Sequence, residues 1–157
     1  MQKMKISEKL MLTNKTYSSK EEALVYVCRK AEELGYTTCE FERNILEREE
    51  TFPTGIQTKI PIAMPHFDAG CNTSFMSLTT LNPPIDFKYM DGSEGTLPVQ
   101  IIFLFGIVDP TDQLEVLKKL METIQNPKAL EEIRNVGSDK EGCSMILKHM
   151  GELVELV

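Results

Sequence analysis

Apolar residues along the chain repeat at two spacings, one typical of helices and the other typical of buried strands. Apolar positions three or four residues apart predict a helix that packs one face against a core. This spacing predicts five helices, at residues 18–33, 37–49, 109–124, 127–134 and 138–150. Capping boxes, in which serine or threonine precedes glutamate by three residues, predict helix starts at Ser18, Thr37 and Ser138. Pro127 suits the first turn of the fourth helix, and Gly35 ends the first.

Short apolar runs between the second and third helices predict the strands of one sheet. They lie at residues 60–64, 75–81, 85–87 and 99–108, with a turn predicted at 82–84, where two prolines follow Asn82. The run at 99–108 is apolar at successive positions, which is typical of a central strand covered on both faces. The order of helices, strands and helices predicts an α/β fold. We expect a single domain over residues 1–157, with a mixed β-sheet flanked by helices on both faces.

Composition and charge narrow the classes of function. The chain has 157 residues, of which 41% are hydrophobic, and no apolar run approaches the about 20 residues of a membrane span. The first residues lack an apolar core and a cleavage site, so we expect no signal peptide. The formal net charge of −7 argues against a nucleic-acid partner and suits a partner with a basic face. The four cysteines form no C-x-x-C pair, so we expect mostly buried free thiols in a reducing cytoplasm.

His66 is the first candidate for chemistry. It follows the predicted strand at 60–64 directly after Pro65, which would hold an imidazole at the edge of the core. Histidine suits proton or group transfer near neutral pH, although a polar residue in a turn would give the same pattern. Several hydroxyl side chains lie nearby in sequence: Thr51, Thr54, Thr73 and Ser74.

Arg48 is the second candidate, near the end of the second predicted helix. It could be a solvated charge at a helix end, or a guanidinium that holds phosphate oxygens through paired hydrogen bonds. Acidic neighbours such as Glu49 could orient it.

The sequence gives little support for a metal site, a hydrolase site or a nucleotide site. His66, His149 and the cysteines have no metal-ligand spacing, so we expect no metal. His149 is interpreted as a favourable charge at the C-terminus of the last helix. A Ser-His-Asp hydrolase has little support, because G-x-S-x-G is absent and Asp68, only two residues from His66, is interpreted as a turn residue. The chain has neither a P-loop nor G-x-G-x-x-G, so we expect no nucleotide or other cofactor.

Three motifs together resemble a known family. Glu47-Arg48-Glu49, Phe52-Pro53-Thr54-Gly55-Ile56 and Ile62-Ala63-Met64-Pro65-His66 are similar to the signature of fructose/mannitol-type (type 2) enzyme IIA domains. These domains belong to the bacterial phosphoenolpyruvate-dependent sugar phosphotransferase system (PTS). The resemblance covers essentially the whole chain. The motif at 52–56 and the lack of a glycine after the histidine most resemble the galactitol-specific members.

The resemblance implies a fold, an activity and roles for residues. The fold is one mixed sheet flanked by helices. Such domains accept a phosphoryl group from the carrier protein HPr and pass it to a cysteine on a IIB component. His66 would be the phosphorylated nucleophile, and Arg48 would stabilise the phosphoryl group. Gln113 lies where many mannitol-type members have a second histidine and where galactitol-type members use glutamine, and Gln113, Thr54 and Glu49 would surround the site.

The remaining expectations concern partners and mechanism. Transfer needs no metal or nucleotide, because positioning and charge stabilisation suffice. The partner that sets the tautomer of His66 is not evident in the sequence. Met64 and Phe67 are expected to form an apolar surface that meets HPr and IIB and excludes water. The membrane component IIC would be reached only through IIB, from the cytoplasm. A regulatory IIA-like protein that acts by binding other proteins is the alternative, and a small hydrolase is a third.

Overall fold

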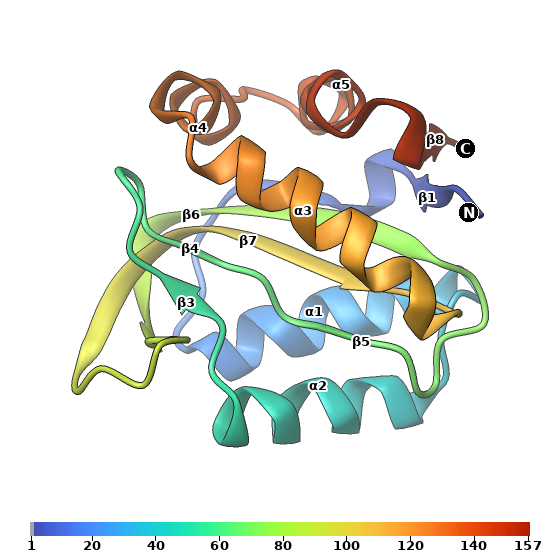
Figure 1. Ribbon diagram of the computed structural model, residues 1–157, viewed down its shortest axis with the longest axis horizontal. Helices are drawn as coiled ribbons and strands as arrows, with labels where there is room; N and C mark the ends of the chain where they lie inside the picture. The colour runs from blue at the N-terminus through green and yellow to red at the C-terminus, as the bar shows by residue number, and fades with distance from the viewer. Residues whose placement is uncertain (1) are drawn as a thin grey trace.

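The two longest strands form the centre of the sheet. In the computed structural model, which describes residues 2–157, β6 (Phe75–Lys88) pairs antiparallel with β7 (Thr96–Gly106). The strand order is β3-β4-β7-β6-β1-β8, with β2 also on β6 and β5 also on β7 (Figure 1). Parallel and antiparallel pairs occur together, so the predicted mixed sheet is confirmed. The shorter strands are β1 (Met4–Ile6), β2 (Met11–Lys15), β3 (Gly55–Ile56), β4 (Ile62–Ala63), β5 (His66–Phe67) and β8 (Val154–Leu156).

Helices cover both faces of the sheet, as predicted. One face carries α1 (Lys20–Glu33) and α2 (Cys39–Thr51). The other carries α3 (Gln113–Ile124), α4 (Pro127–Arg134) and α5 (Asp139–Met150) (Figure 1). Three short 3-10 helices complete the chain: η1 (Glu8–Leu10), η2 (Pro110–Asp112) and η3 (Gly151–Leu153). The result is a three-layer α/β arrangement with the sheet in the middle.

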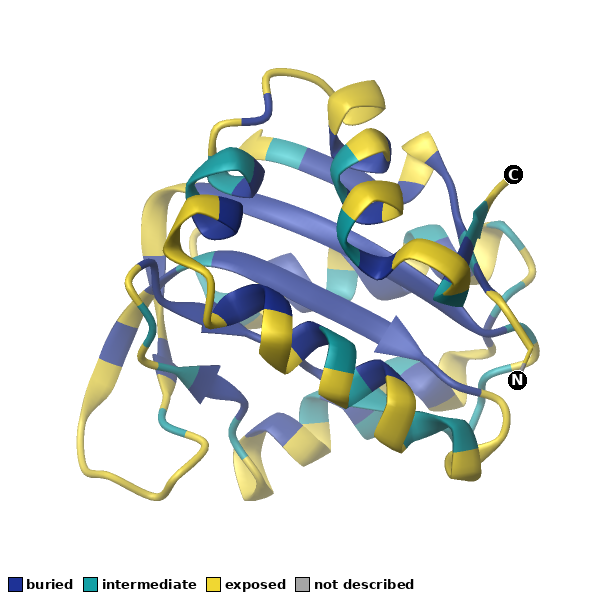
Figure 2. Ribbon diagram, turned by 45° about the horizontal axis from the view of Figure 1, so that its top comes forward, coloured by how far each residue is buried: buried dark blue, intermediate teal, exposed yellow. Residues whose placement is uncertain are grey.

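Strand β7 is apolar and buried on both faces over residues 101–105, because it contributes to two cores. Ile101, Phe103 and Phe105 belong to the core under α3, α4 and α5. Ile102 and Leu104 belong to the other core, under α1 and α2. Successive side chains of a strand point to opposite faces, so both sets are buried at once (Figure 2). The prediction of a central strand here is confirmed.

The turn predicted at residues 82–84 was wrong. Strand β6 runs through this stretch without turning back, and the strand predicted at 85–87 is its continuation. The register against β7 shifts between Thr80 and Ile85, so the regular ladder is interrupted there. Prolines cannot donate to a ladder, and Pro83 and Pro84 fall within this interruption.

The termini form strands that the pattern did not predict. β1 and β8 are three residues each and pair in parallel, and β1 also pairs with β6. β1 and β8 therefore lie side by side at one edge of the sheet (Figure 1). A strand of three residues is too short to show a clear alternation of apolar and polar positions. β1 and β8 also lie at opposite ends of the sequence, so no local pattern indicates that they pair.

The capping predictions had mixed outcomes. Ser138 caps α5 as predicted, with its hydroxyl accepting from the Glu141 N–H. The cap of α1 lies one residue later than predicted, at Ser19. The capping box at Thr37 was wrong, because α2 begins after Thr38, whose side chain accepts no capping hydrogen bond. Helix α3 begins at Gln113, since residues 110–112 form a separate 3-10 turn.

Other boundary signals behaved as expected. Gly35 follows the end of α1 with a φ of +81°, a conformation that favours glycine. Pro127 begins α4 after an Asn126 cap. Among the described residues, no helix combines the length and hydropathy that crossing a bilayer requires.

Gly55 joins β3 to the end of the β6–β7 hairpin, with its carbonyl accepting from the Met90 N–H at 2.8 Å. A Cβ at this position would lie 2.5 Å from the Lys88 carbonyl oxygen and 2.6 Å from a Leu97 methyl carbon. We expect Gly55→Ala to lower the free energy of unfolding by about 1–3 kcal/mol, measured by urea denaturation.

Gly137→Ala is the matched control. Its Cβ would meet only the Glu141 carboxylate, at 3.8 Å, so we expect little change in stability. Equal stability of the two variants would contradict the close approach at Gly55.

Candidate functional site

His66 is held at the end of the sheet by strand pairing and ring stacking. It opens β5, whose register places it opposite Phe105 on β7. The imidazole stacks on the Phe105 ring with centroids 4.8 Å apart and planes 4° from parallel. Pro65 contributes its carbonyl, which accepts from the Phe105 N–H at 3.1 Å. The ring is therefore half-buried and fixed on a rigid element, as the Pro-His pattern predicted.

The hydrogen bonds of His66 define its tautomer. Nδ1 lies 2.8 Å from the Met64 carbonyl oxygen, which can only accept, so Nδ1 carries the proton. Nε2 then presents a lone pair, and the Gln113 side-chain amide donates to it at 3.1 Å. The tautomer partner that the sequence did not reveal is thus the backbone of Met64. Gln113 reaches the ring from the first residue of α3, 47 positions along the chain.

The charge state of His66 follows from its surroundings. Burial lowers the pKa of His66 below its ordinary value of 6.5, and the positive charge of Arg48 lowers this pKa further. The bond to the Met64 carbonyl opposes this by favouring the protonated ring. The imidazole is therefore neutral at pH 7, and Nε2 is available as a nucleophile.

Arg48 lies beside His66 but is not paired with an acid. Its guanidinium carbon is 5.0 Å from the centre of the Phe52 ring and 5.2 Å from that of Phe67. Within residues 2–157, the side chain of Arg48 has no ion pair and makes no hydrogen bond. Its N–H groups are therefore free to bind an anion in the cleft that Arg48 and His66 both line.

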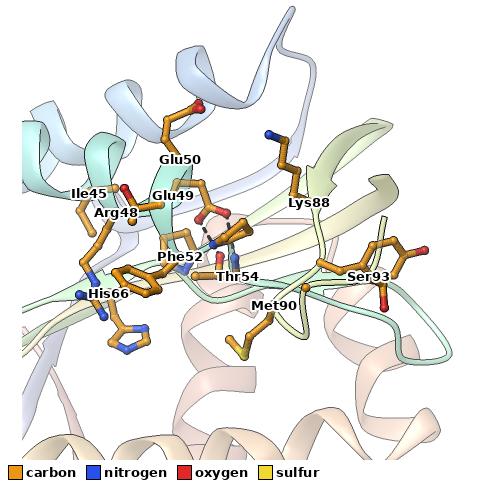
Figure 3. A pocket seen from close by; sticks show the side chains of 15 residues that line it. Ile45, Arg48, Glu49, Glu50, Phe52, Thr54, His66, Lys88, Met90 and Ser93 are labelled. Atoms are coloured by element: carbon orange, nitrogen blue, oxygen red, sulfur yellow. Dashed lines mark hydrogen bonds between the residues drawn. The ribbon is translucent and has the colours of Figure 1, made fainter. Parts of the chain in front are cut away.

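Glu49 does not orient Arg48, which differs from the expectation. Its side chain turns inward, is 2% exposed, and accepts from the Thr54 N–H at 2.8 Å and the Thr54 hydroxyl at 2.7 Å (Figure 3). Burial raises the pKa of the Glu49 carboxyl, and the two Thr54 bonds act in the opposite direction. This buried pair ties the end of α2 to the loop at 52–55.

A cleft of about 540 Å³ brings four of the five predicted site residues together. His66, Arg48, Glu49 and Thr54 line it, and Lys88, Met90 and Ser93 from the β6–β7 hairpin form another part of its wall (Figure 3). Gln113 is the fifth and contacts His66 directly. The hairpin residues were not anticipated, since nothing in their local sequence indicates that they line the same cleft as His66.

The apolar surface around the cleft differs from the one predicted. Met64 is 1% exposed and belongs to the core under α3, so it cannot meet a partner and that prediction was wrong. Phe67 is half-buried. Phe52 is 60% exposed at the cleft, and Leu114, next to Gln113, is 76% exposed. Exposed apolar side chains of this kind suit a protein partner.

The hydroxyls near His66 in sequence have other roles. Ser74 is buried and accepts from the Val108 N–H at 2.9 Å. The Thr54 hydroxyl donates to Glu49, and the Thr51 hydroxyl donates to the Glu47 carbonyl at 3.2 Å. Asp68 accepts from the Ala69 N–H, in keeping with its interpretation as a turn residue.

His149 does not carry the predicted charge. It lies in the last turn of α5, but burial and then Lys148 lower the pKa of its imidazole. All four cysteines are free thiols, with Cys28 and Cys143 buried, Cys71 partly buried and Cys39 exposed. Across residues 2–157, no group of three or more His, Cys, Asp or Glu side chains could hold a metal ion.

Comparisons with solved structures identify the fold. Mannitol IIA from Escherichia coli is 16% identical with a TM-score of 0.72, over 90% of this chain and 98% of that one. The nitrogen regulatory protein IIA-Ntr from Neisseria meningitidis is 21% identical with a TM-score of 0.70, over 91% and 96%. The IIA–phosphorylated IIB mannitol complex from E. coli matches at 14% identity and a TM-score of 0.71, over 89% and 95%. The fold is that of the mannitol-type IIA proteins.

The family follows from the sequence match. Residues 4–149 match the model described as "Phosphoenolpyruvate-dependent sugar phosphotransferase system, EIIA 2". The chain belongs to this family of phosphotransferase components. The comparison with curated proteins finds no match.

The environment of His66 has a measurable consequence for its titration. We expect ¹H–¹⁵N NMR of the imidazole to show the Nδ1-protonated tautomer at neutral pH and a pKa below 6.5, because burial and Arg48 oppose protonation. Arg48→Ala should raise this pKa by removing the nearby positive charge. Lys88→Ala, which removes another cation from the same cleft, should leave it unchanged. A His66 pKa at or above 6.5, or one insensitive to Arg48→Ala, would contradict this.

The Glu49–Thr54 pair should contribute to stability. Glu49→Ala leaves the Thr54 N–H and hydroxyl buried without a partner, so we expect the free energy of unfolding to fall by about 1–3 kcal/mol. Glu49→Gln should lose less, because its amide oxygen can still accept. The exposed neighbour variant Glu50→Ala serves as the control in urea denaturation and should change stability by no more than about 0.5 kcal/mol. Equal effects of Glu49→Ala and Glu50→Ala would rule out this role.

Proposed function

We propose that the chain, as one domain over residues 1–157, is a phosphocarrier of the sugar PTS. It accepts a phosphoryl group from phospho-HPr on Nε2 of His66 and passes it to a cysteine of a IIB component. One observation carries this proposal. Nε2 is an unprotonated nitrogen on a rigid strand, at a cleft where an arginine has no acid partner.

The transfer is a reversible in-line displacement at phosphorus. The lone pair of Nε2 forms the new P–N bond, and the electron pair of the donor's P–N bond returns to the donor imidazole. The Nδ1 proton stays on His66, where the Met64 carbonyl stabilises the positive charge that the ring gains. In the second step the IIB thiolate attacks phosphorus, and the electron pair of the P–Nε2 bond returns to His66.

Two side chains stabilise the charge of the phosphoryl group. Arg48 supplies several N–H donors that no carboxylate occupies, and a guanidinium can hold two phosphoryl oxygens at once. The Gln113 amide, which donates to Nε2 in the free ring, donates to a phosphoryl oxygen after transfer. Glu49 and Thr54 act indirectly by holding the 52–55 loop, since the Thr54 hydroxyl is already bonded. Transfer uses no metal or other cofactor.

The partners follow from the surface and the relatives. The exposed side chains of Phe52, Met90 and Leu114 surround the site with apolar contact area, and the net charge of −7 favours the basic face of a donor such as HPr. The E. coli mannitol IIA is described in complex with phosphorylated IIB, which supports a IIB acceptor. The protein would work in the cytoplasm and reach the membrane component IIC only through IIB. We propose no nucleic-acid partner.

Galactitol is the sugar alcohol that we propose for the pathway. Gln113 beside His66, the motif at 52–56 and Phe67 after the histidine support this subtype. A panel of purified IIB components would test it. We expect phosphoryl transfer from phospho-His66 to be fastest to a galactitol-type IIB, and faster transfer to a mannitol-type IIB would overturn the assignment.

A regulatory role is the second candidate. The similarity to IIA-Ntr, a nitrogen regulatory protein, favours it. A chain that accepts phosphate from HPr but transfers it to no IIB component would support regulation over transport.

The central test is phosphorylation itself. With phosphoenolpyruvate, enzyme I and HPr, we expect one acid-labile phosphate per chain and its loss in His66→Ala, because Nε2 is the acceptor. Arg48→Ala should slow labelling. Unchanged labelling of His66→Ala would exclude His66 as the acceptor.

Gln113 has a separate test. Gln113→Ala removes one hydrogen bond to a charged phosphoryl group, so we expect labelling to slow by about tenfold. Gln125→Ala, an exposed glutamine at the other end of α3, is the control and should label at the normal rate. If both variants behave alike, Gln113 has no part in transfer.

A further inference from the structure

We propose that Phe52 and Phe67 form an aromatic clamp that positions Arg48 beside Nε2 of His66. The inference rests on the proposed function for its consequence, since Arg48 matters to transfer only if His66 is phosphorylated. The two phenylalanines are positioning residues, because they act through Arg48 and not on the phosphoryl group.

The clamp replaces the carboxylate that usually orients a functional arginine. Both oxygens of Glu49 are bonded to Thr54, and Glu50 lies 3.9 Å from the Lys20 ammonium. The guanidinium carbon instead lies 5.0 Å and 5.2 Å from the centres of the two phenylalanine rings. These distances are within the about 6 Å over which a ring face attracts a cation.

The clamp is itself held by the backbone. The Phe52 N–H donates to the Arg48 carbonyl at 2.6 Å, and the Glu49–Thr54 pair anchors the residues that follow. Phe67 is the residue after His66 on β5 and is paired with Gly106 on β7. One ring therefore comes from the end of α2 and the other from the strand that carries His66. The guanidinium of Arg48 lies over both rings. Figure 3 shows Phe52 and Arg48 next to His66.

Aromatic positioning has a chemical advantage over an ion pair at this site. A ring face attracts the guanidinium without accepting its N–H groups, so these remain available for phosphoryl oxygens. A carboxylate in the same place would occupy two donors and repel the incoming dianion. It would also favour the protonated form of His66, which is not a nucleophile.

The exposure of Phe52 permits a different role, that of a residue which only contacts the partner protein. The two roles predict different responses to leucine, which preserves apolar area but has no ring face. The first test therefore compares Phe52→Tyr, Phe52→Trp and Phe52→Leu in the full chain without any phosphoryl donor.

In this first test the readouts are the NMR shift of the Arg48 Cδ protons and the pKa of His66. We expect the aromatic variants to keep the wild-type upfield ring-current shift and His66 pKa. Phe52→Leu should reduce the upfield shift, since only Phe67 remains, and should raise the His66 pKa toward 6.5 by weakening the effect of Arg48, while burial still lowers it. A leucine variant that keeps both, or tyrosine and tryptophan variants that lose them as fully as leucine, would overturn the clamp. Because no donor is present, these readouts stand even if phosphorylation of His66 is not found.

The second test measures transfer from phospho-HPr at saturating donor. We expect Phe52→Leu to slow the maximal rate by about threefold to tenfold, with Phe52→Trp close to wild type. In an Arg48→Ala background, Phe52→Leu should cause no further slowing, because it acts through Arg48. A rise only in the half-saturating HPr concentration, with Arg48 signals unchanged, would make Phe52 a docking residue and overturn the proposal.

Two controls complete the design. Tyr26→Leu removes an exposed ring that Lys30 approaches at 5.5 Å on α1, away from the cleft, and should transfer at the normal rate. Phe67→Tyr and Phe67→Leu test the other ring, with thermal unfolding checked first because Phe67 is half-buried. If Phe67→Leu folds and keeps the Arg48 shift, Phe67 is not part of the clamp. If the wild-type chain accepts no phosphate, the proposed function fails while the first test still decides the clamp.

Discussion

The structure depends on one strand, β7, that has pairing partners along both edges and apolar side chains on both faces. β6 pairs along one edge, and β4 and β5 pair in succession along the other. Its alternate residues complete two separate cores, so each helical layer is attached to the sheet through the same strand. The end of β7 also supplies Phe105, on which the His66 imidazole stacks. A change that shifted the register of β7 would therefore affect both cores and the site together.

The orientation of the His66 ring and of its Nε2 lone pair is set by the backbone and by neutral side chains. The Met64 carbonyl sets the tautomer of His66, the Phe105 ring sets the plane of the imidazole, and Gln113 marks the direction of the lone pair. Transfer of a phosphoryl group needs mostly positioning and charge stabilisation, and both can be built from backbone and neutral side chains. Arg48 lies in the same cleft as His66, with its guanidinium over the rings of Phe52 and Phe67 and with no ion pair among residues 2–157. This combination keeps the imidazole neutral and leaves donors available.

Membership of the type 2 EIIA family and the mannitol-type fold agree with this chemistry, although the solved relatives are 14–21% identical to the chain. At such identities the similarity reports the fold. The details of the candidate site therefore come from this chain's own residues, among them Gln113, Phe67 and the exposed Phe52. Gln113 contacts the His66 ring, and the guanidinium of Arg48 lies over the rings of Phe52 and Phe67.

The sequence by itself determined the helices, the central strand and the layered fold class, and it indicated His66 and Arg48 as candidates, because each depends on short-range patterns. Helical spacing, a doubly apolar strand and the Pro-His and Arg motifs are all visible within a few residues. The tertiary structure alone decided the pairing of β1 with β8, the continuation of β6 through its prolines, and the inward turn of Glu49. It also decided that Gln113 reaches Nε2, that Met64 contributes a carbonyl and not a surface, and that two rings enclose Arg48. Strand register and helix packing set the distances between these residues. A pattern of a few neighbouring residues in the sequence does not contain those distances.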